Sequence, residues 1–121
     1  MSVVTPVFNS ARFLAETLDS VARLTVSHEH IVLDGGSTDG TVQLLEARGD
    51  PRLTWVSEPD RGQTHAVNKG FERAQGELLG WLNGDDEYVS EAVDRAVSDL
   101  LAHPEVAVYG GMDITDEDGL T

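Results

Sequence analysis

Residues 31–41 read IVLDGGSTDGT, and this stretch decides the expected fold. Its first half continues an apolar run that ends abruptly at a pair of glycines. A short apolar run bounded by turn residues predicts a buried strand, here over residues 30–34. A short helix is expected from about residue 40 to residue 48, with Val42 and Leu45 facing inward. The stretch therefore predicts one strand–loop–helix unit.

The same alternation continues on both sides of this unit. Strands are expected at residues 2–7, 30–34, 53–56, 78–82, 106–109 and 112–115. Further helices are expected after Ser10, whose side chain would cap the first turn, over residues 66–74, and after Ser90. Strands alternating with helices of this length predict βαβ units and a mostly parallel sheet. Residues 1–121 are therefore expected to form a single α/β domain.

The fourth expected strand, LLGWL at residues 78–82, is apolar without alternation. Continuous apolar strands are typical of sheets that are covered on both faces. Trp81 is accordingly expected in the core. The preceding segment at residues 58–63 contains a proline and a glycine, so a loop is expected there.

The composition excludes several classes of protein. The net charge of −14 argues against nucleic-acid binding, because phosphates attract basic surfaces. The absence of cysteine excludes disulfides and thiolate metal sites. No apolar run approaches the roughly 20 residues that span a bilayer. From Asn83 onward the chain holds 11 of its 22 acidic residues and one base, Arg95. Such a charge excess usually marks a solvated surface, but some of these carboxylates could surround a divalent cation.

Polar residues follow the predicted strands directly. They lie at residues 5–9 (TPVFN), 34–40 (DGGSTDG) and 83–86 (NGDD). Ligands of open α/β sheets bind beyond the carboxyl ends of the strands, so these loops are expected to meet along one edge. Taken alone, residues 34–40 fit a turn followed by a helix cap equally well. Neither the spacing of a calcium loop nor a G-x-G-x-x-G fingerprint is present.

The adjacent carboxylates Asp85 and Asp86 indicate a function more specifically than the residues of the other loops do. Two neighbouring carboxylates after an apolar strand repel each other and lose hydration unless positive charge lies nearby. Mg²⁺ or Mn²⁺ would supply that charge, with substrate phosphates and water completing the shell. The N-terminus of the helix that follows is the alternative source of stabilisation.

The other candidate residues are ambiguous when each is taken singly. Arg61 is either a solvated surface charge or a clamp for a diphosphate, which its planar donor fork suits. His65 shares a helix face with Asn68 and, taken singly, fits a surface position. Phe8 would need an exposed ring face to stack on a base. These residues gain meaning only in combination.

The segments TPVFN, IVLDGGSTDGT, SEPDRGQTHAVNKGF and GELLGWLNGDDEY occur in this order along the chain. Their order and spacing resemble family-two inverting glycosyltransferases of the GT-A fold. The resemblance runs from Ser2 to at least Tyr88, and the tail VAVYGGMDITDEDG is similar to the next strand pair of these enzymes. It implies a Rossmann-like, mostly parallel sheet flanked by helices, with the chain ending before the acceptor-binding half.

The resemblance also implies roles for individual residues. Those expected at a nucleotide-sugar donor site are Thr5, Pro6, Phe8, Asp34, Arg61, His65, Asn68, Asn83 and Gly84. Within this set, Phe8 would stack on the nucleobase, Asp34 would hydrogen-bond it, and Arg61 would lie near the diphosphate. Asn83 replaces the first acid of a D-x-D motif, so Asp85 is the first choice as ligand of Mg²⁺ or Mn²⁺ and Asp86 the second.

The implied reaction moves a sugar from a nucleotide donor, by preference a UDP-sugar, to an acceptor hydroxyl with inversion. The metal and Arg61 would stabilise the departing nucleoside diphosphate, while a carboxylate base in the acceptor half would activate the hydroxyl. No residue of this chain matches that base. The acceptor is expected to be a carbohydrate or a lipid-linked sugar, in the synthesis of a cell-surface polysaccharide or a glycoconjugate.

Two alternatives and several expectations about context accompany this interpretation. The chain is alternatively a nucleotide-sugar-binding module or fragment without transfer activity. A nucleotidyltransferase is disfavoured, because the loop after the first strand offers only Arg12 to hold a triphosphate. The protein is expected in the cytoplasm, with the inner face of the membrane as an alternative location. Peripheral membrane association or dimerisation through regions outside this chain are left open.

Overall fold

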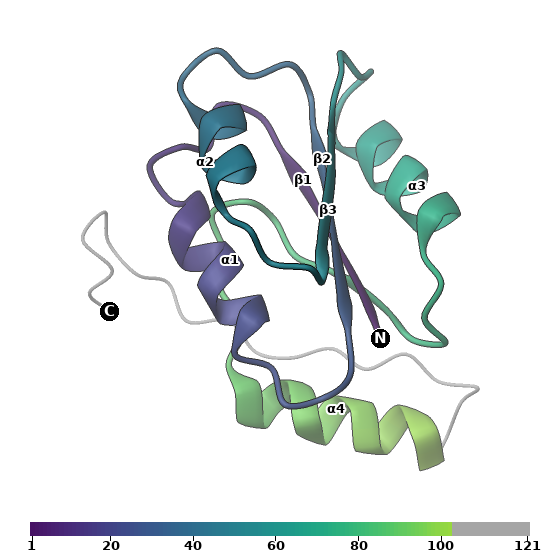
Figure 1. Ribbon diagram of the computed structural model, residues 1–121. Helices are drawn as coiled ribbons and strands as arrows, with labels where there is room; N and C mark the ends of the chain where they lie inside the picture. Colours follow the sequence, from purple (N-terminus) through teal and green to yellow (C-terminus); the bar gives the residue numbers. More distant parts are fainter. Residues whose placement is uncertain (103–121) are drawn as a thin grey trace.

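The computed structural model describes residues 1–102, and the strands expected at residues 106–109 and 112–115 lie outside them. Four strands alternate with four helices along the described chain (Figure 1). The elements in chain order are β1 (Ser2–Val7), α1 (Leu14–Ala22), β2 (Glu29–Asp34), α2 (Thr41–Ala47), β3 (Leu53–Ser57), α3 (Gln63–Arg73), β4 (Leu79–Trp81) and α4 (Ser90–Ala102). The predicted strand–helix alternation is confirmed over this range.

The strands form one sheet in the order β3-β2-β1-β4, and every pairing is parallel. The chain first proceeds outward from β1 through β2 to β3, and then returns across β1 to place β4 on its other side. The two neighbours of β1 are therefore reached in opposite directions. Sheets of this kind have a crevice at that reversal, beyond the carboxyl ends of the strands.

Helices cover both faces of the sheet. One face packs on α1 and α2, where Val7 and Val32 contact Leu14, Leu18 and Leu45. The opposite face packs on α3 (Figure 1), and this layer includes Val4, Ile31, Leu33 and Ala66. A further cluster around Val3 and Val21 includes Val93 of α4. Successive residues of β1 thus enter different cores, as the two-residue period of a strand requires.

Gly70 sets the distance between α3 and the sheet. A Cβ atom at this position would lie 2.3 Å from Val4 Cγ1 and 2.9 Å from Leu33 Cδ2. Neither distance is tolerable for packed carbon atoms. The missing side chain allows α3 to lie close to β1 and β2.

Pro6 marks the point where β1 separates from β4. The even-numbered residues of β1 face β4, since Ser2 N donates to Leu78 O and Leu82 N donates to Val4 O. The pairing of these two strands ends at Val4 and Trp81. Pro6 has no N–H to donate and would be the next residue to face that side. The gap between the two strands therefore opens at Pro6.

Three local expectations are wrong. The side chain of Ser10 does not cap α1: its carbonyl accepts the first turn's N–H groups, from Phe13 at 3.1 Å and Leu14 at 2.9 Å. Trp81 is 50% exposed and Leu79 is 51% exposed, because β4 is an edge strand within the described sheet. Val42 is only partly buried, whereas Leu45 is buried as expected.

None of the helices within residues 1–102 is long and apolar enough to cross a membrane.

Candidate functional site at the carboxyl edge of the sheet

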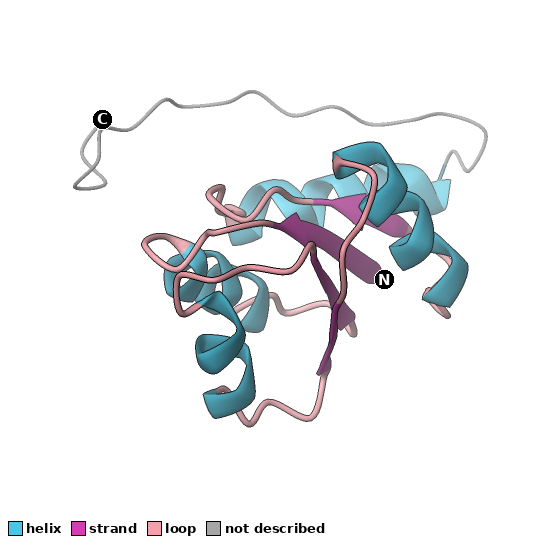
Figure 2. Ribbon diagram, turned by 90° about the horizontal axis from the view of Figure 1, so that it is seen from above, coloured by secondary structure: helices cyan, strands magenta, loops and turns pink. Residues whose placement is uncertain are grey.

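A cavity of about 850 Å³ opens at the carboxyl edge of the sheet. Figure 2 looks down on this edge, where the loops that follow the strands lie together above the sheet. The cavity is lined by the loop after β1, the start of α3 and the loop after β4, with one glycine from the loop after β2. The lining residues are Pro6, Val7, Phe8, Asn9, Ser10, Phe13, Gly35, Asp60, Gly62, Gln63, Ala66, Asn83, Gly84 and Asp85.

The loops after β1 and β2 hold each other in place. Asn9 N donates to Ser37 Oγ at 2.7 Å, and Thr38 N donates back to Asn9 Oδ1 at 2.9 Å. Asn9 has a positive φ of 50°, which its short polar side chain tolerates better than most residues do. Asp39 accepts from Ala11 N at 3.1 Å and from Thr41 N at 3.1 Å. The expected turn at residues 34–40 therefore forms, whereas the N-cap of α2 is Gly40 and no side chain caps the helix.

Asp34 organises the loop after β2 from beneath. Its carboxylate is 1% exposed and does not line the cavity. It accepts hydrogen bonds from Gly36 N at 3.1 Å, Ser37 N at 2.9 Å, Ser37 Oγ at 2.5 Å and Ser57 Oγ at 2.7 Å. These donors replace the water that the carboxylate loses on burial. The predicted contact of Asp34 with a base stays a prediction.

Thr5 also lies below the pocket. Its side chain is fully buried, and its Oγ1 is hydrogen-bonded to His30 Nε2 at 2.7 Å. Burial is the main cause that lowers the pKa of His30 to about 3. The imidazole is therefore neutral at physiological pH, and the pair is a satisfied polar contact of the core. Of the residues predicted from the β1 loop, Pro6 and Phe8 reach the cavity.

Helix α1 holds the loop after β4. The buried hydroxyl of Thr17 lies 2.6 Å from Asp86 O and 3.1 Å from Gly84 O, so one donor serves both carbonyls. One turn later, Ser20 Oγ accepts from Tyr88 N at 3.1 Å. Gly84 is required at its position, because a Cβ there would lie 2.6 Å from Val7 Cγ1. The loop after β4 is thus held by Thr17 at Gly84 and Asp86 and by Ser20 at Tyr88.

Asn83 joins the two sides of the cavity mouth. Its Oδ1 accepts from Gln63 Nε2, at the start of α3, and from Trp81 Nε1 at 3.0 Å. Sequence reasoning placed Asn83 in the position of a metal-binding acid. In the structure the side-chain oxygen of Asn83 accepts hydrogen bonds from two donors, so Asn83 links α3 to the loop after β4.

The carboxylates of Asp85 and Asp86 are exposed, and neither forms an ion pair within residues 1–102. Partial burial, followed by the charge of Asp85, raises the pKa of Asp86 above its ordinary value. Of these two aspartates, Asp85 lines the cavity and Asp86 does not. No group of three or more His, Cys, Asp or Glu residues with metal-binding geometry occurs in the described part of the chain. A cation bound here would therefore need ligands from a substrate and water.

The loop before α3 is closed by its own hydrogen bonds. Arg61 N donates to His65 Nδ1 at 2.8 Å, and Gly62 N donates to Asp60 Oδ1 at 3.0 Å. Arg61 and Asn68 are exposed, His65 is half-buried, and none of them lines the cavity. Arg61 lies between Asp60 and Gly62, both of which line the cavity.

Five of the predicted residues line one cavity together: Pro6, Phe8, Asn83, Gly84 and Asp85. Sequence reasoning missed several lining residues, of which Asp60, Gln63 and Gly35 matter most. A signal for Asp60 was available, since it stands in a glycine-containing loop directly beside Arg61. Gln63 gave no signal, because its contact with Asn83 joins segments that are 20 residues apart.

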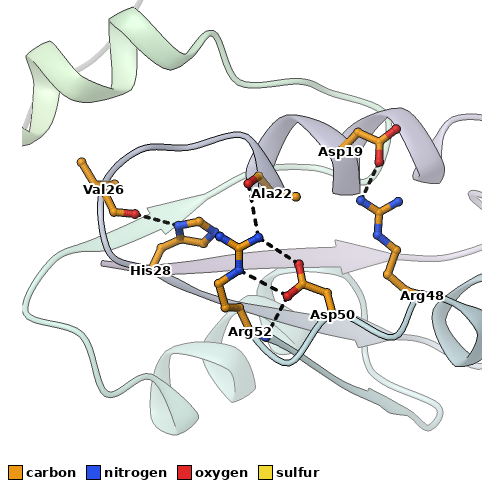
Figure 3. Close-up of polar contacts among 7 residues, drawn as sticks. All are labelled: Asp19, Ala22, Val26, His28, Arg48, Asp50 and Arg52. Atoms are coloured by element: carbon orange, nitrogen blue, oxygen red, sulfur yellow. Dashed lines mark hydrogen bonds and ion pairs between the residues drawn. The ribbon is translucent and has the colours of Figure 1, made fainter.

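A second group of charged residues lies near the amino ends of β2 and β3 (Figure 3). Arg48 pairs with Asp19 at 2.5 Å, and Arg52 pairs with Asp50 at 3.3 Å and donates to Ala22 O at 3.3 Å. His28 Nδ1 lies 2.8 Å from Val26 O. The charges of this group pair with one another and connect α1 to the segment before β3, so we assign the group a structural role.

These features define a class of protein: a parallel α/β domain with a cavity at the reversal of its strand order. Comparison with protein families then gives the assignment. The model of glycosyl transferase family 2 matches residues 2–121, and the chain belongs to this family. The resemblance read from the four sequence segments is thereby confirmed.

Individual relatives agree with this assignment. The chain is 31% identical to the putative teichuronic acid biosynthesis glycosyltransferase TuaG of Bacillus subtilis, over 98% of this chain and 49% of the relative. It is 38% identical to an uncharacterized glycosyltransferase of Mycobacterium tuberculosis, over 92% of this chain and 44% of the relative. A relative in Rickettsia felis is matched over 20% of its length. The chain thus spans less than half the length of these curated relatives.

Solved structures share the fold. The mannosyltransferase PcManGT from Pyrobaculum calidifontis, in complex with GDP-Man and Mn²⁺, superimposes with a TM-score of 0.75 at 30% identity. The match covers 82% of this chain and 31% of that one. S. aureus TarS 1-349 in complex with UDP-GlcNAc gives a TM-score of 0.74 at 28% identity, over 85% of this chain and 31% of TarS. The parallel sheet with flanking helices is therefore the GT-A fold.

Proposed function

We propose that the cavity binds the nucleoside diphosphate of a nucleotide-sugar donor, from which the parent enzyme transfers the sugar to an acceptor hydroxyl with inversion. The observation that carries the proposal is the joint lining of one cavity by Phe8 and Asp85. Phe8 is 63% exposed and offers a ring face to a base. Asp85 offers a carboxylate to a cation that binds phosphate oxygens.

The residues at the loop after β4 fit a hard divalent cation such as Mg²⁺ or Mn²⁺. Asp85 would be the principal ligand, with Asp86 beside it. Partial burial and then the charge of Asp85 raise the pKa of Asp86, and a cation beside these two carboxylates would favour their charged forms. When bound, the cation would stabilise negative charge on a departing diphosphate.

The protein's own groups would orient the donor. The loops after β1 and β2 are fastened to each other, and Thr17 fastens the loop after β4, so the cavity is formed in advance. Arg61, which lies between two residues that line the cavity, would place its guanidinium against the diphosphate. We assign no general base within residues 1–121. The proposed donor is a UDP-sugar and the proposed acceptor a carbohydrate or a lipid-linked sugar in cell-surface polysaccharide synthesis.

Calorimetric titration of UDP, GDP, dTDP and UMP, with and without Mn²⁺, tests this proposal. We expect a nucleoside diphosphate to bind in the presence of Mn²⁺, and UMP to bind more weakly because it lacks the second phosphate. The substitution Asp85→Ala should abolish the dependence on Mn²⁺. The matched control is Asp99→Ala, which removes the same charge from an exposed position on α4 and should leave binding unchanged. Absence of binding by every diphosphate at millimolar concentration would reject the donor site.

A further inference from the structure

The cavity has two ends, and the strand order separates them. Asp85 follows β4 and Gly35 follows β2, while β1 lies between these strands. Neighbouring strands are about 4.8 Å apart, so the two ends are roughly 10 Å apart. A nucleoside diphosphate whose phosphates lie at Asp85 would extend its base over Phe8 toward the β2 end. This step rests on the function proposed above.

The β2 end does not present the carboxylate of Asp34. That carboxylate is buried, and its oxygens accept hydrogen bonds from the loop and from Ser57. The next residue, Gly35, has no side chain and lines the cavity. With both oxygens of Asp34 already engaged, we look to another segment for a side chain that recognises a base at this end.

Asp60 occupies the space above Gly35. A Cβ atom on Gly35 would lie 3.0 Å from Asp60 Oδ2, so the carboxylate lies where a side chain at position 35 would be. Asp60 Oδ1 accepts from Gly62 N at 3.0 Å, which holds the carboxylate in place. Within residues 1–102, Oδ2 has no hydrogen-bond donor. Asp60 thus presents one fixed acceptor oxygen to the cavity.

We propose that Asp60 determines which nucleobase the donor site accepts. Its carboxylate would accept a hydrogen bond from a ring N–H, namely N3–H of uracil or thymine, or N1–H of guanine. Cytosine N3 and adenine N1 carry lone pairs at the corresponding positions, and these repel a carboxylate. The site should therefore prefer uracil, thymine or guanine nucleotides to cytosine and adenine nucleotides.

The competing interpretation is that Asp60 only shapes its loop through the bond to Gly62. If the role of Asp60 is purely structural, its loss would weaken the binding of all nucleotides by the same factor. Loss of base recognition would change the ratio between nucleotides. The ratio of dissociation constants within one variant therefore separates the two interpretations.

The experiment measures the dissociation constants of UDP, CDP, GDP and ADP in the presence of Mn²⁺ for the full 121-residue chain. We expect UDP to bind at least about tenfold more tightly than CDP, or GDP than ADP, because a site that pairs with an N–H rejects a base that lacks it. Asp60→Asn retains the carbonyl oxygen that accepts from Gly62 and adds an amide N–H that can donate to cytosine N3. This variant should reduce the preference by about tenfold, and Asp60→Ala should reduce it as well.

Glu58→Gln is the matched control, since it removes one carboxylate from the same loop at an exposed position outside the cavity. It should leave the ratio unchanged. The proposal is overturned if the wild-type chain binds all four nucleotides equally, or if both Asp60 variants weaken them by one common factor. If no nucleotide binds the wild-type chain, the donor site itself fails, which is a different result.

Discussion

His30 and Thr5 form a polar pair inside the core, with 2.7 Å between Nε2 and Oγ1. Asp34 lies at the carboxyl end of β2, the strand that contains His30, and is similarly buried and hydrogen-bonded. Each of these side chains exchanges its hydration for a small set of protein partners. At the scale of single residues, the sheet is therefore held by buried polar groups at both ends of β2, with His30 near its amino end and Asp34 at its carboxyl end.

The low pKa of His30 makes stability depend on pH. The pKa is lowered to about 3 from an ordinary value of 6.5, first by burial and then by the charge of His28. Between these two values the unfolded chain binds the proton more strongly, so the free energy of unfolding should fall as the pH decreases. From pH 7 to pH 4.5 the loss due to His30 should be about 2 to 3 kcal/mol.

Urea unfolding at pH 7 and pH 4.5 measures this loss. Glu29, Asp39, Asp50 and Glu58 also have lowered pKa values and act in the same direction, so the wild-type chain alone does not isolate His30. His30→Gln removes the titrating group and should show a smaller loss than the wild type. Equal losses in the two proteins would contradict the assignment.

At the scale of elements, α1 and α3 contribute to different parts of the site. The turns of α1 bind the loop after β4, while the start of α3 contributes Gln63 and Ala66 to the cavity. These contacts join elements that are far apart in the sequence. The position of the carboxylates therefore depends on helix packing as well as on the residues of their own loop.

Removal of the Thr17 hydroxyl should loosen the loop after β4. Thr17→Val keeps the shape of the side chain but leaves the carbonyls of Gly84 and Asp86 without their donor, at a cost of about 1 to 2 kcal/mol. Urea unfolding gives this cost, and calorimetry should show weaker Mn²⁺-dependent binding of UDP. Thr17→Ser retains the hydroxyl and should restore the binding. If Ser and Val weaken binding equally, the hydroxyl does not position the loop.

The close contact of α3 with the sheet should not tolerate a methyl group. Gly70→Ala would place Cβ 2.3 Å from Val4 Cγ1. Overpacking of this kind costs about 1 to 3 kcal/mol, which outweighs the roughly 1 kcal/mol that alanine gains in helix propensity. The midpoint of urea unfolding should therefore decrease. Glu72→Ala on the exposed side of α3 is the control, and a Gly70→Ala protein of equal stability would disprove the steric argument.

At the scale of the whole molecule, the strand order places the cavity. The reversal of direction at β1 separates the carboxyl ends of β1 and β4, and Pro6 leaves the gap open. Phe8, Asp60 and Asp85 come from three different connections and meet there. The chain thus combines the parts that would hold a leaving group.

Residues 1–121 alone are expected to bind the donor without efficient transfer, because no general base is assigned within them. Incubation with radiolabelled UDP-sugars, Mn²⁺ and candidate acceptors, followed by separation of the product, measures transfer. We expect at most slow hydrolysis of the donor, while calorimetry on the same preparation shows binding. Robust formation of a glycosylated acceptor by this chain would contradict the expectation.

The sequence by itself determined the alternation of strands and helices, the parallel sheet and the edge at which the cavity opens. These follow from local patterns: apolar runs, helical spacing and turn residues. The polar loops after the parallel strands predicted a site at that edge, and the family resemblance placed Phe8 and Asp85 in it. The sequence could not show that Asp34 and Thr5 lie beneath the pocket, since burial depends on which donors the neighbouring strands supply.

Only the tertiary structure placed Asp60 above Gly35, Thr17 under the loop after β4, and Trp81 at a half-exposed edge. The two side-chain contacts join residues 25 and 69 positions apart, and no local pattern encodes contacts at that range. The physical reason is that side-chain direction and exposure follow from packing between elements. The sequence therefore specified which loops meet at this edge, and packing decided which of their side chains line the cavity.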